Sequence, residues 1–208
     1  MYKRLTVLLL AAIAGVSASS AHGFDLINNN SSEKGFSHLL YGNPDLMGLG
    51  KTIELLIDFS QAEIVEFDKD FNITKSYGSI DDYNRAQGQQ AVDNWKEDLL
   101  LLEERLCAQL DMIFASDCET VGHIGNPAYR MVIRMGLFDF GHKAPLIAKD
   151  GGMAAKGLIE IYEISSGELA AVFDINYVRG KNSMYGKIDR IREFAICFAR
   201  GIKKPLKK

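Results

Sequence analysis

The sequence predicts a single α+β domain, with an antiparallel sheet of about four to five strands and two amphipathic helices packed on one face. Apolar alternation occurs in several runs that are close together along the chain, and two segments with helical periodicity flank most of them. Hydrophobic residues make up 47% of the 208 positions, which is enough to form the core of one domain. This order favours α+β over the alternating units that build parallel sheets.

Residues 1–21 have the layout of a secretory signal peptide. Lys3 and Arg4 are followed by an apolar run of about a dozen residues and then by small residues that end at Ala21, the expected cleavage site. The run is shorter than the ~20 residues needed to span a bilayer. We therefore expect a periplasmic or secreted protein with no transmembrane segment once the peptide is removed. Removal would change the formal net charge from −3 to −5.

Residues 22–50 are rich in Asn, Ser and Gly, and we interpret them as a mobile lead-in. The domain is expected to occupy residues 51–208. Apolar residues alternate from Lys51 to Phe59, as in a half-buried strand, and the run can continue to Phe67. Charged residues and glycine over 68–82 indicate a loop.

A long helix is predicted over 89–114, because its apolar residues recur at spacings of three and four. Alternation predicts three more strands, over 129–137, 158–164 and 169–178, the last two joined by a tight turn. Arg130 and Arg134 fall on the polar side of the first of these strands. A second amphipathic helix is predicted from Ile188 to Ile202, with Ile188, Ile191, Ala195, Phe198 and Ile202 on its apolar face.

Residues 45–52 resemble the nucleotide-binding motif of helicase-like ATPases. In that reading Gly48, Gly50, Lys51 and Thr52 would contact phosphate and metal. A phosphate loop, however, follows a buried strand and opens a helix at the Lys-Thr pair. Here the residues after Lys51 alternate as in a strand, so we interpret the motif as a turn that leads into the first strand. No cofactor is predicted.

The cysteines allow two readings in an oxidising compartment. Cys107 and Cys118 could form a disulfide across the end of the long helix, or Cys107 could be a separate core residue. No two Cys or His residues stand at the short spacing of a structural zinc site, so no metal site is predicted.

Three features carry a resemblance to known proteins. They are Asp58-Phe59-Ser60 at a strand end, Trp95 in the long helix, and Ser166-Gly167-Glu168 in the hairpin. With the exported leader, they resemble small uncharacterised exported proteins of Gram-negative bacteria. The layout over 51–202 is distantly similar to the periplasmic domain of the curli-secretion lipoprotein, although the lipid-attachment cysteine of that protein is missing. The resemblance implies an α+β fold and identifies no catalytic residue.

These observations predict a non-catalytic, envelope-associated module that binds another envelope protein or a ligand. Lys and Arg number 24 against 27 Asp and Glu, a near balance that gives no sign of nucleic-acid binding. The chain has no Gly-x-Ser-x-Gly nucleophile motif. The main alternative is an exported hydrolase whose carboxylates converge in space, and a lesser one is a nucleotide binder that uses the 45–52 motif.

Overall fold

The computed structural model describes residues 38–42, 52–114, 120–121, 126–141, 152–181 and 186–206. Over these residues the chain is α+β, as predicted, but its sheet is larger than expected. In chain order the elements are β1 (His38–Gly42), β2 (Thr52–Asp58), β3 (Glu63–Phe67), β4 (Ile73–Ser79), α1 (Ile80–Gln87), α2 (Gln89–Phe114), β5 (Thr120–Val121), β6 (Tyr129–Asp139), β7 (Ala154–Glu163), β8 (Leu169–Arg179) and α3 (Lys187–Leu206).

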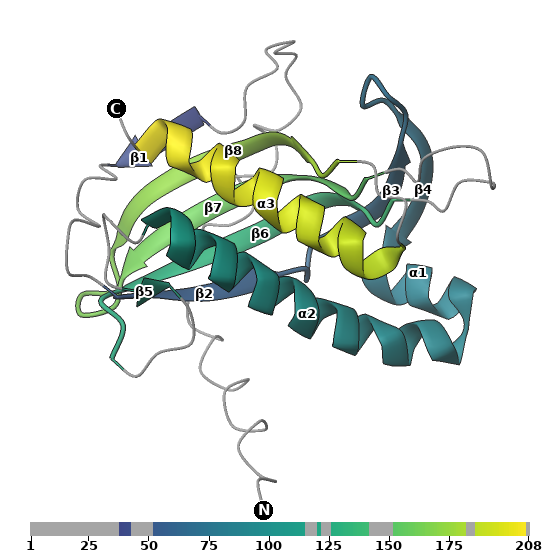
Figure 1. The fold of residues 1–208 in the computed structure, drawn as a ribbon, viewed down its shortest axis with the longest axis horizontal. Coiled ribbons are helices and arrows are strands. Elements are labelled where there is room, and N and C mark those ends of the chain that lie inside the picture. Colours follow the sequence, from purple (N-terminus) through teal and green to yellow (C-terminus); the bar gives the residue numbers. More distant parts are fainter. Residues whose placement is uncertain are drawn as a thin grey trace, which may run out of the picture. The chain divides into compact units, whose positions relative to one another are not determined.

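The sheet is mixed, so the prediction of an antiparallel sheet of four to five strands was wrong. Eight described strands take part, in the order β1-β8-β7-β6-β2-β5, with β3 paired to β6 and β4 (Figure 1). β2 is parallel to both β5 and β6, and β3 is also parallel to β6. The parallel pairing follows from the connections: α2 lies between β2 and β6 in the chain, and a helical crossover lets two strands run in the same direction.

Two segments that were predicted to lack regular structure contain strands. β1 pairs antiparallel with β8, so at least this part of the lead-in belongs to the sheet. β4 pairs with β3 and leads directly into α1, and together β4 and α1 occupy most of the predicted 68–82 loop. The β1–β8 pairing depends on a distant partner in the chain, whereas β3 and β4 form a local hairpin whose second strand is mostly exposed and therefore lacks apolar alternation. A local signal for α1 was present, because the Ser79 side chain caps its N-terminus and Asp82 completes a capping box.

The two long helices agree with the prediction. α2 has the predicted bounds, and Leu102, Leu106 and Leu110 are buried along its apolar face. α3 extends to Leu206 and buries Ile191, Ala195 and Phe198, as expected. Ile188, which was placed on that face, is instead 61% exposed because it lies in the first turn.

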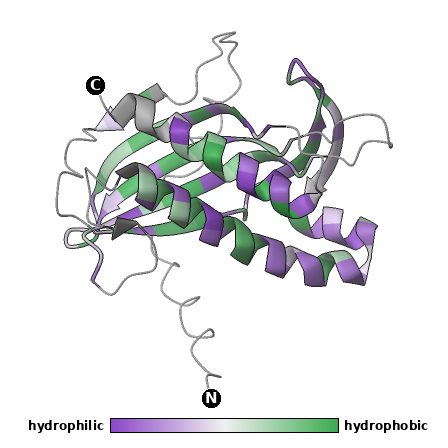
Figure 2. Cartoon of the chain, in the orientation of Figure 1, coloured by the Kyte–Doolittle hydropathy of each residue, from purple (hydrophilic) through white to green (hydrophobic). Residues whose placement is uncertain are grey.

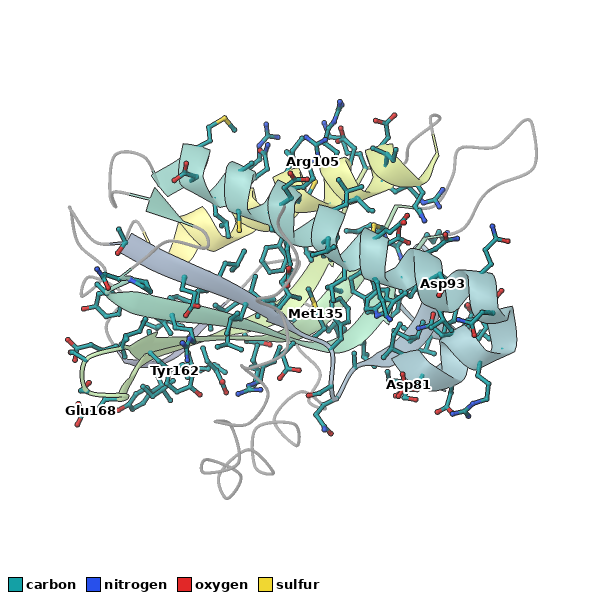
Figure 3. All side chains as sticks on the ribbon, turned by 90° about the horizontal axis from the view of Figure 1, so that it is seen from below. Asp81, Asp93, Arg105, Met135, Tyr162 and Glu168 are labelled. Atoms are coloured by element: carbon teal, nitrogen blue, oxygen red, sulfur yellow. The ribbon has the colours of Figure 1, made fainter. Side chains whose placement is uncertain are left out.

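α2 and α3 lie over one face of the sheet, and the core fills the space between the layers (Figures 1 and 2). Figure 3 shows Met135 between the helices and the sheet, whereas Arg105 points outward from α2. Gly180 lets α3 approach the end of β8, because a Cβ there would lie 2.7 Å from the backbone nitrogen of Phe194. A side chain at position 180 would therefore displace the helix or the strand end.

Ion pairs cross the other face of the sheet, where Arg130 and Arg134 lie as predicted. Arg130 Nε is 2.6 Å from Glu54, and Arg134 binds both Asp58 and Glu160. These contacts join β2, β6 and β7 on the side of the sheet that the helices leave uncovered.

In the described part of the chain, no helix combines the length and apolar character needed to cross a membrane.

Candidate ligand pocket

A pocket of about 200 Å³ lies where α1, the start of α2, the end of β6 and the first turn of α3 meet. We call it the helix-junction pocket. In Figure 1 the three helices come together at this end, and in Figure 3 the labels of Asp81 and Asp93 mark the α1 and α2 side of it. Its lining combines aromatic rings, amides and charged groups from segments that are far apart in sequence.

Aromatic side chains form the apolar part of the lining. Tyr83 stacks on Phe140 with 5.0 Å between ring centroids, and Trp95 meets Phe140 edge-on at 5.4 Å. Phe138, from the same strand end, packs edge-on against Phe140. Each ring is held by at least one other, so this wall is ordered before any ligand enters. Trp95 is also the single tryptophan of the chain, which makes it a natural fluorescent reporter of the pocket.

The break between α1 and α2 brings Tyr83 and Trp95 to the same pocket. Gly88 has a φ of +90°, a conformation that L-residues with side chains rarely adopt, and its N–H donates to the Asn84 carbonyl at 3.0 Å. The chain therefore ends one helix and begins the next within two residues. This sharp turn folds α1 back so that its last turns face the start of α2.

Asn84 is the most unusual group in the lining. The residue is only 5% exposed, and its side-chain amide makes no hydrogen bond to another residue in the part of the chain that the structure describes. Among the described residues, the amide atoms of Asn84 do not belong to the fully buried side-chain atoms that lack a partner, so they are accessible from the pocket. Because Asn84 lines the pocket, a water molecule or the polar group of a ligand could satisfy it from inside.

Charged groups of both signs surround the pocket. Lys187 Nζ lies 2.6 Å from Asp98 Oδ1, and Arg190 lines the pocket one turn further along α3. Asp139 lies behind Gly141: its carboxylate is buried and accepts hydrogen bonds from the backbone N–H groups of Phe67 and Gly141. These four side chains carry two positive and two negative formal charges, so the surroundings are close to neutral.

Burial raises the pKa of the Tyr83 phenol, and the nearby Tyr77, Glu66, Asp139 and Asp98 act in the same direction. The phenol therefore keeps its proton at neutral pH. Tyr83 contributes a stacking surface and a neutral hydroxyl group to the pocket and adds no charge.

Of the 45–52 motif, the structure describes Thr52. Gly48, Gly50 and Lys51 lie outside the described residues, whereas Thr52 begins β2, as expected from the alternation. The Thr52 hydroxyl donates to the carbonyl of Asn126 and accepts from the N–H of Ala128, both at 3.2 Å. Thr52 is thus engaged in holding β2 against the start of β6, and no helix begins at this position.

The cysteine pairing stays a prediction, because Cys118 lies outside the described residues. Cys107 is half-buried on α2, and burial, followed by the nearby Glu103 and Asp111, raises the pKa of its thiol to about 11. Within the described residues, no group of three or more His, Cys, Asp or Glu side chains is arranged to hold a metal ion. Asp58 holds a turn through the N–H of Ser60 and also pairs with Arg134.

Sequence reasoning did not identify the residues of this pocket. Asn84, Asp98 and Lys187 come from three different helices, and no spacing in the sequence connects them. The Ser79–Asp82 capping box was the one local signal, since it predicts a short helix that would present Asn84 beside α2.

No family model and no curated protein matches the chain. Two crystal forms of the PelC dodecamer from Paraburkholderia phytofirmans, one of them a single-residue variant, are 10% and 9% identical to it, each with a TM-score of 0.41. The alignments cover 81% and 80% of this chain and 98% of the PelC chain. Protein XCC0632 from Xanthomonas campestris, of family model DUF330, is 12% identical, with a TM-score of 0.36 and coverage of 80% of this chain and 88% of that one. Likeness of this degree does not indicate a shared activity.

Proposed function

We propose that this chain is an exported, non-catalytic binding protein that holds a small ligand in the helix-junction pocket. The observation that carries the proposal is the aromatic pocket lined by Asn84, a residue that is only 5% exposed and whose side-chain amide is accessible from the pocket. Ligand sites typically combine apolar walls with a few placed polar groups, and this pocket has that composition. The leader at residues 1–21 and the resemblance to exported Gram-negative proteins support the exported location.

The lining favours binding over hydrolysis. Glycoside hydrolysis, for example, requires two carboxyl groups about 5–9 Å apart, one on each side of the bond. Asp98 is the one carboxylate among the described residues that line this pocket, and it is paired with Lys187. On the opposite face of the sheet, Asp58 and Glu160 share Arg134. The guanidinium pairs with both carboxylates and holds them in a structural contact.

The proposal is tested by filling the pocket. Ala91 lines it from α2, so Ala91→Phe would occupy part of the volume, whereas Ala108→Phe places the same ring on an exposed position of the same helix. The unmodified protein and both variants are titrated with the small-molecule fraction of the exported compartment, and Trp95 fluorescence is recorded. We expect a saturable change for the unmodified protein and for Ala108→Phe, and none for Ala91→Phe. Equal responses from all three proteins, or none from any, would contradict the proposal.

A further inference from the structure

We propose that the helix-junction pocket selects a neutral, single-ring molecule bearing an amide-like group, and that Asn84 is the residue that selects it. This inference rests on the proposed function, because it names the class of ligand for the same pocket. Its support comes from the size of the pocket, the chemistry of Asn84 and the balance of charge around them.

The size of the pocket suits a single ring. A dry protein cavity of roughly 150 Å³ holds one benzene molecule. The helix-junction pocket measures about 200 Å³, which leaves room for a ring and one small substituent. Tyr83, Trp95 and Phe140 offer the ring both stacking and edge-on neighbours.

Asn84 defines the substituent. Its side-chain amide offers two N–H donors and a carbonyl acceptor, so a group that both donates and accepts is its best complement. A primary amide on the ligand meets this requirement, whereas a methyl group would leave the Asn84 amide buried and unsatisfied. A site built around a hydrogen bond binds an analogue that lacks the matching group much more weakly, because the polar group of the protein then loses its partner.

The charges around the pocket favour a neutral ligand. Lys187 and Asp98 neutralise each other at 2.6 Å. Arg190 also lines the pocket, and the carboxylate of Asp139 lies behind Gly141. A ligand with a full charge would disturb this balance and would lose its own hydration on entry, a cost that a neutral amide largely avoids.

Three single-ring probes test the selection in the full-length mature protein: benzamide, benzoate and toluene, each titrated with Trp95 fluorescence as the readout. We expect benzamide to bind about tenfold to hundredfold more tightly than the other two. Asn84→Leu should remove this preference, and Gln90→Leu, which replaces an exposed amide outside the pocket, should keep it. Asn84→Asp should gain affinity for benzamidine, a cationic analogue of benzamide, because the new carboxylate would pair with its positive charge.

The outcomes separate this inference from the proposed function. Equal affinities for benzamide and toluene, or a preference for benzamide that survives in Asn84→Leu, would overturn the role of Asn84 and leave the pocket a binding site. If benzoate bound most tightly of the three probes, the inference that the pocket selects a neutral ligand would be overturned. If none of the probes binds while the Ala91→Phe comparison still shows uptake of a natural ligand, the ligand class is wrong and the binding function stands.

Discussion

Asp98 on α2 and Lys187 in the first turn of α3 form an ion pair of 2.6 Å, with the two side chains 18% and 46% exposed. The pair joins the two helices at the end where the helix-junction pocket lies, and both residues line that pocket. Because α3 follows β8 while α2 precedes β6, the contact connects segments that are almost ninety positions apart in sequence. The ion pair therefore connects the two helices beside the pocket.

We predict a coupling free energy of about 1 kcal/mol between these two residues, since one partner is largely shielded and the other is half-exposed. Asp98→Asn, Lys187→Met and the double variant form the cycle, and urea unfolding provides the free energies. The coupling should weaken at high salt because the pair is partly open to solvent. A coupling indistinguishable from zero at low salt would show that the contact does not hold the helices.

Leu106 and Leu100 provide a matched test of helix orientation. Both lie on α2, but Leu106 is fully buried and Leu100 is 67% exposed. Leu106→Ala should lower the free energy of unfolding by about 2–5 kcal/mol, because it leaves a cavity between helix and sheet. Leu100→Ala should change it by less than about 0.5 kcal/mol. Similar losses from the two variants would mean that α2 packs on the sheet with a different face.

Arg134 should contribute more to stability than Arg130 on the same strand. Arg134 binds Asp58 and Glu160, whereas Arg130 pairs with Glu54 and is more exposed. Arg134→Met leaves two partly buried carboxylates close together without a cation, and we expect a loss of about 1–3 kcal/mol. Arg130→Met should cost about 1 kcal/mol or less. The stabilities of the two variants are compared by thermal unfolding at neutral pH. A larger loss of stability from Arg130→Met than from Arg134→Met would contradict the greater contribution of Arg134.

The Cys107 thiol should make the fold less stable at alkaline pH. Its pKa rises from an ordinary value of 9.0 to about 11 in the folded protein, chiefly through burial. Between these two values the unfolded chain releases the proton while the folded chain retains it, so unfolding becomes more favourable as the pH rises. This stabilising contribution is fully present below pH 9 and is lost as the pH passes 11.

Cys107→Ala isolates this effect when both proteins are unfolded by urea in the presence of a reductant. The free-energy difference between the unmodified protein and the variant should shrink as the pH is raised across that window. Tyr83 and Cys197, whose pKa values are also raised by burial, remain in both proteins and serve as a common background. A difference that is independent of pH would show that the Cys107 thiol is not desolvated.

Features set by local periodicity could be predicted from the sequence. α2 and most of α3 follow from apolar spacing, and the turn between β7 and β8 follows from its glycine and the alternation on either side. The parallel placement of β2 and β3 beside β6, and the pairing of β1 with β8, depend on distant partners that leave no mark on the local pattern. The mixed sheet was missed for this reason.

The pocket could not be predicted for a related reason. Asn84 is an ordinary polar residue of a short helix, and its significance comes only from being buried beside Trp95 and the start of α3. The Gly-Lys-Thr motif is the opposite case, because it is easily recognised in the sequence but lacks the required structure. A phosphate loop needs a helix that begins at the Lys-Thr pair, and here a strand begins at Thr52.

The most direct test of the account is the intact mass of the protein recovered from the exported fraction of its native cells. We predict a chain that begins at His22, found outside the cytosol, since the binding proposal requires the leader to be removed during export. A cytosolic protein that still begins at Met1 would contradict this. It would also return the 45–52 motif to a compartment that contains nucleotides.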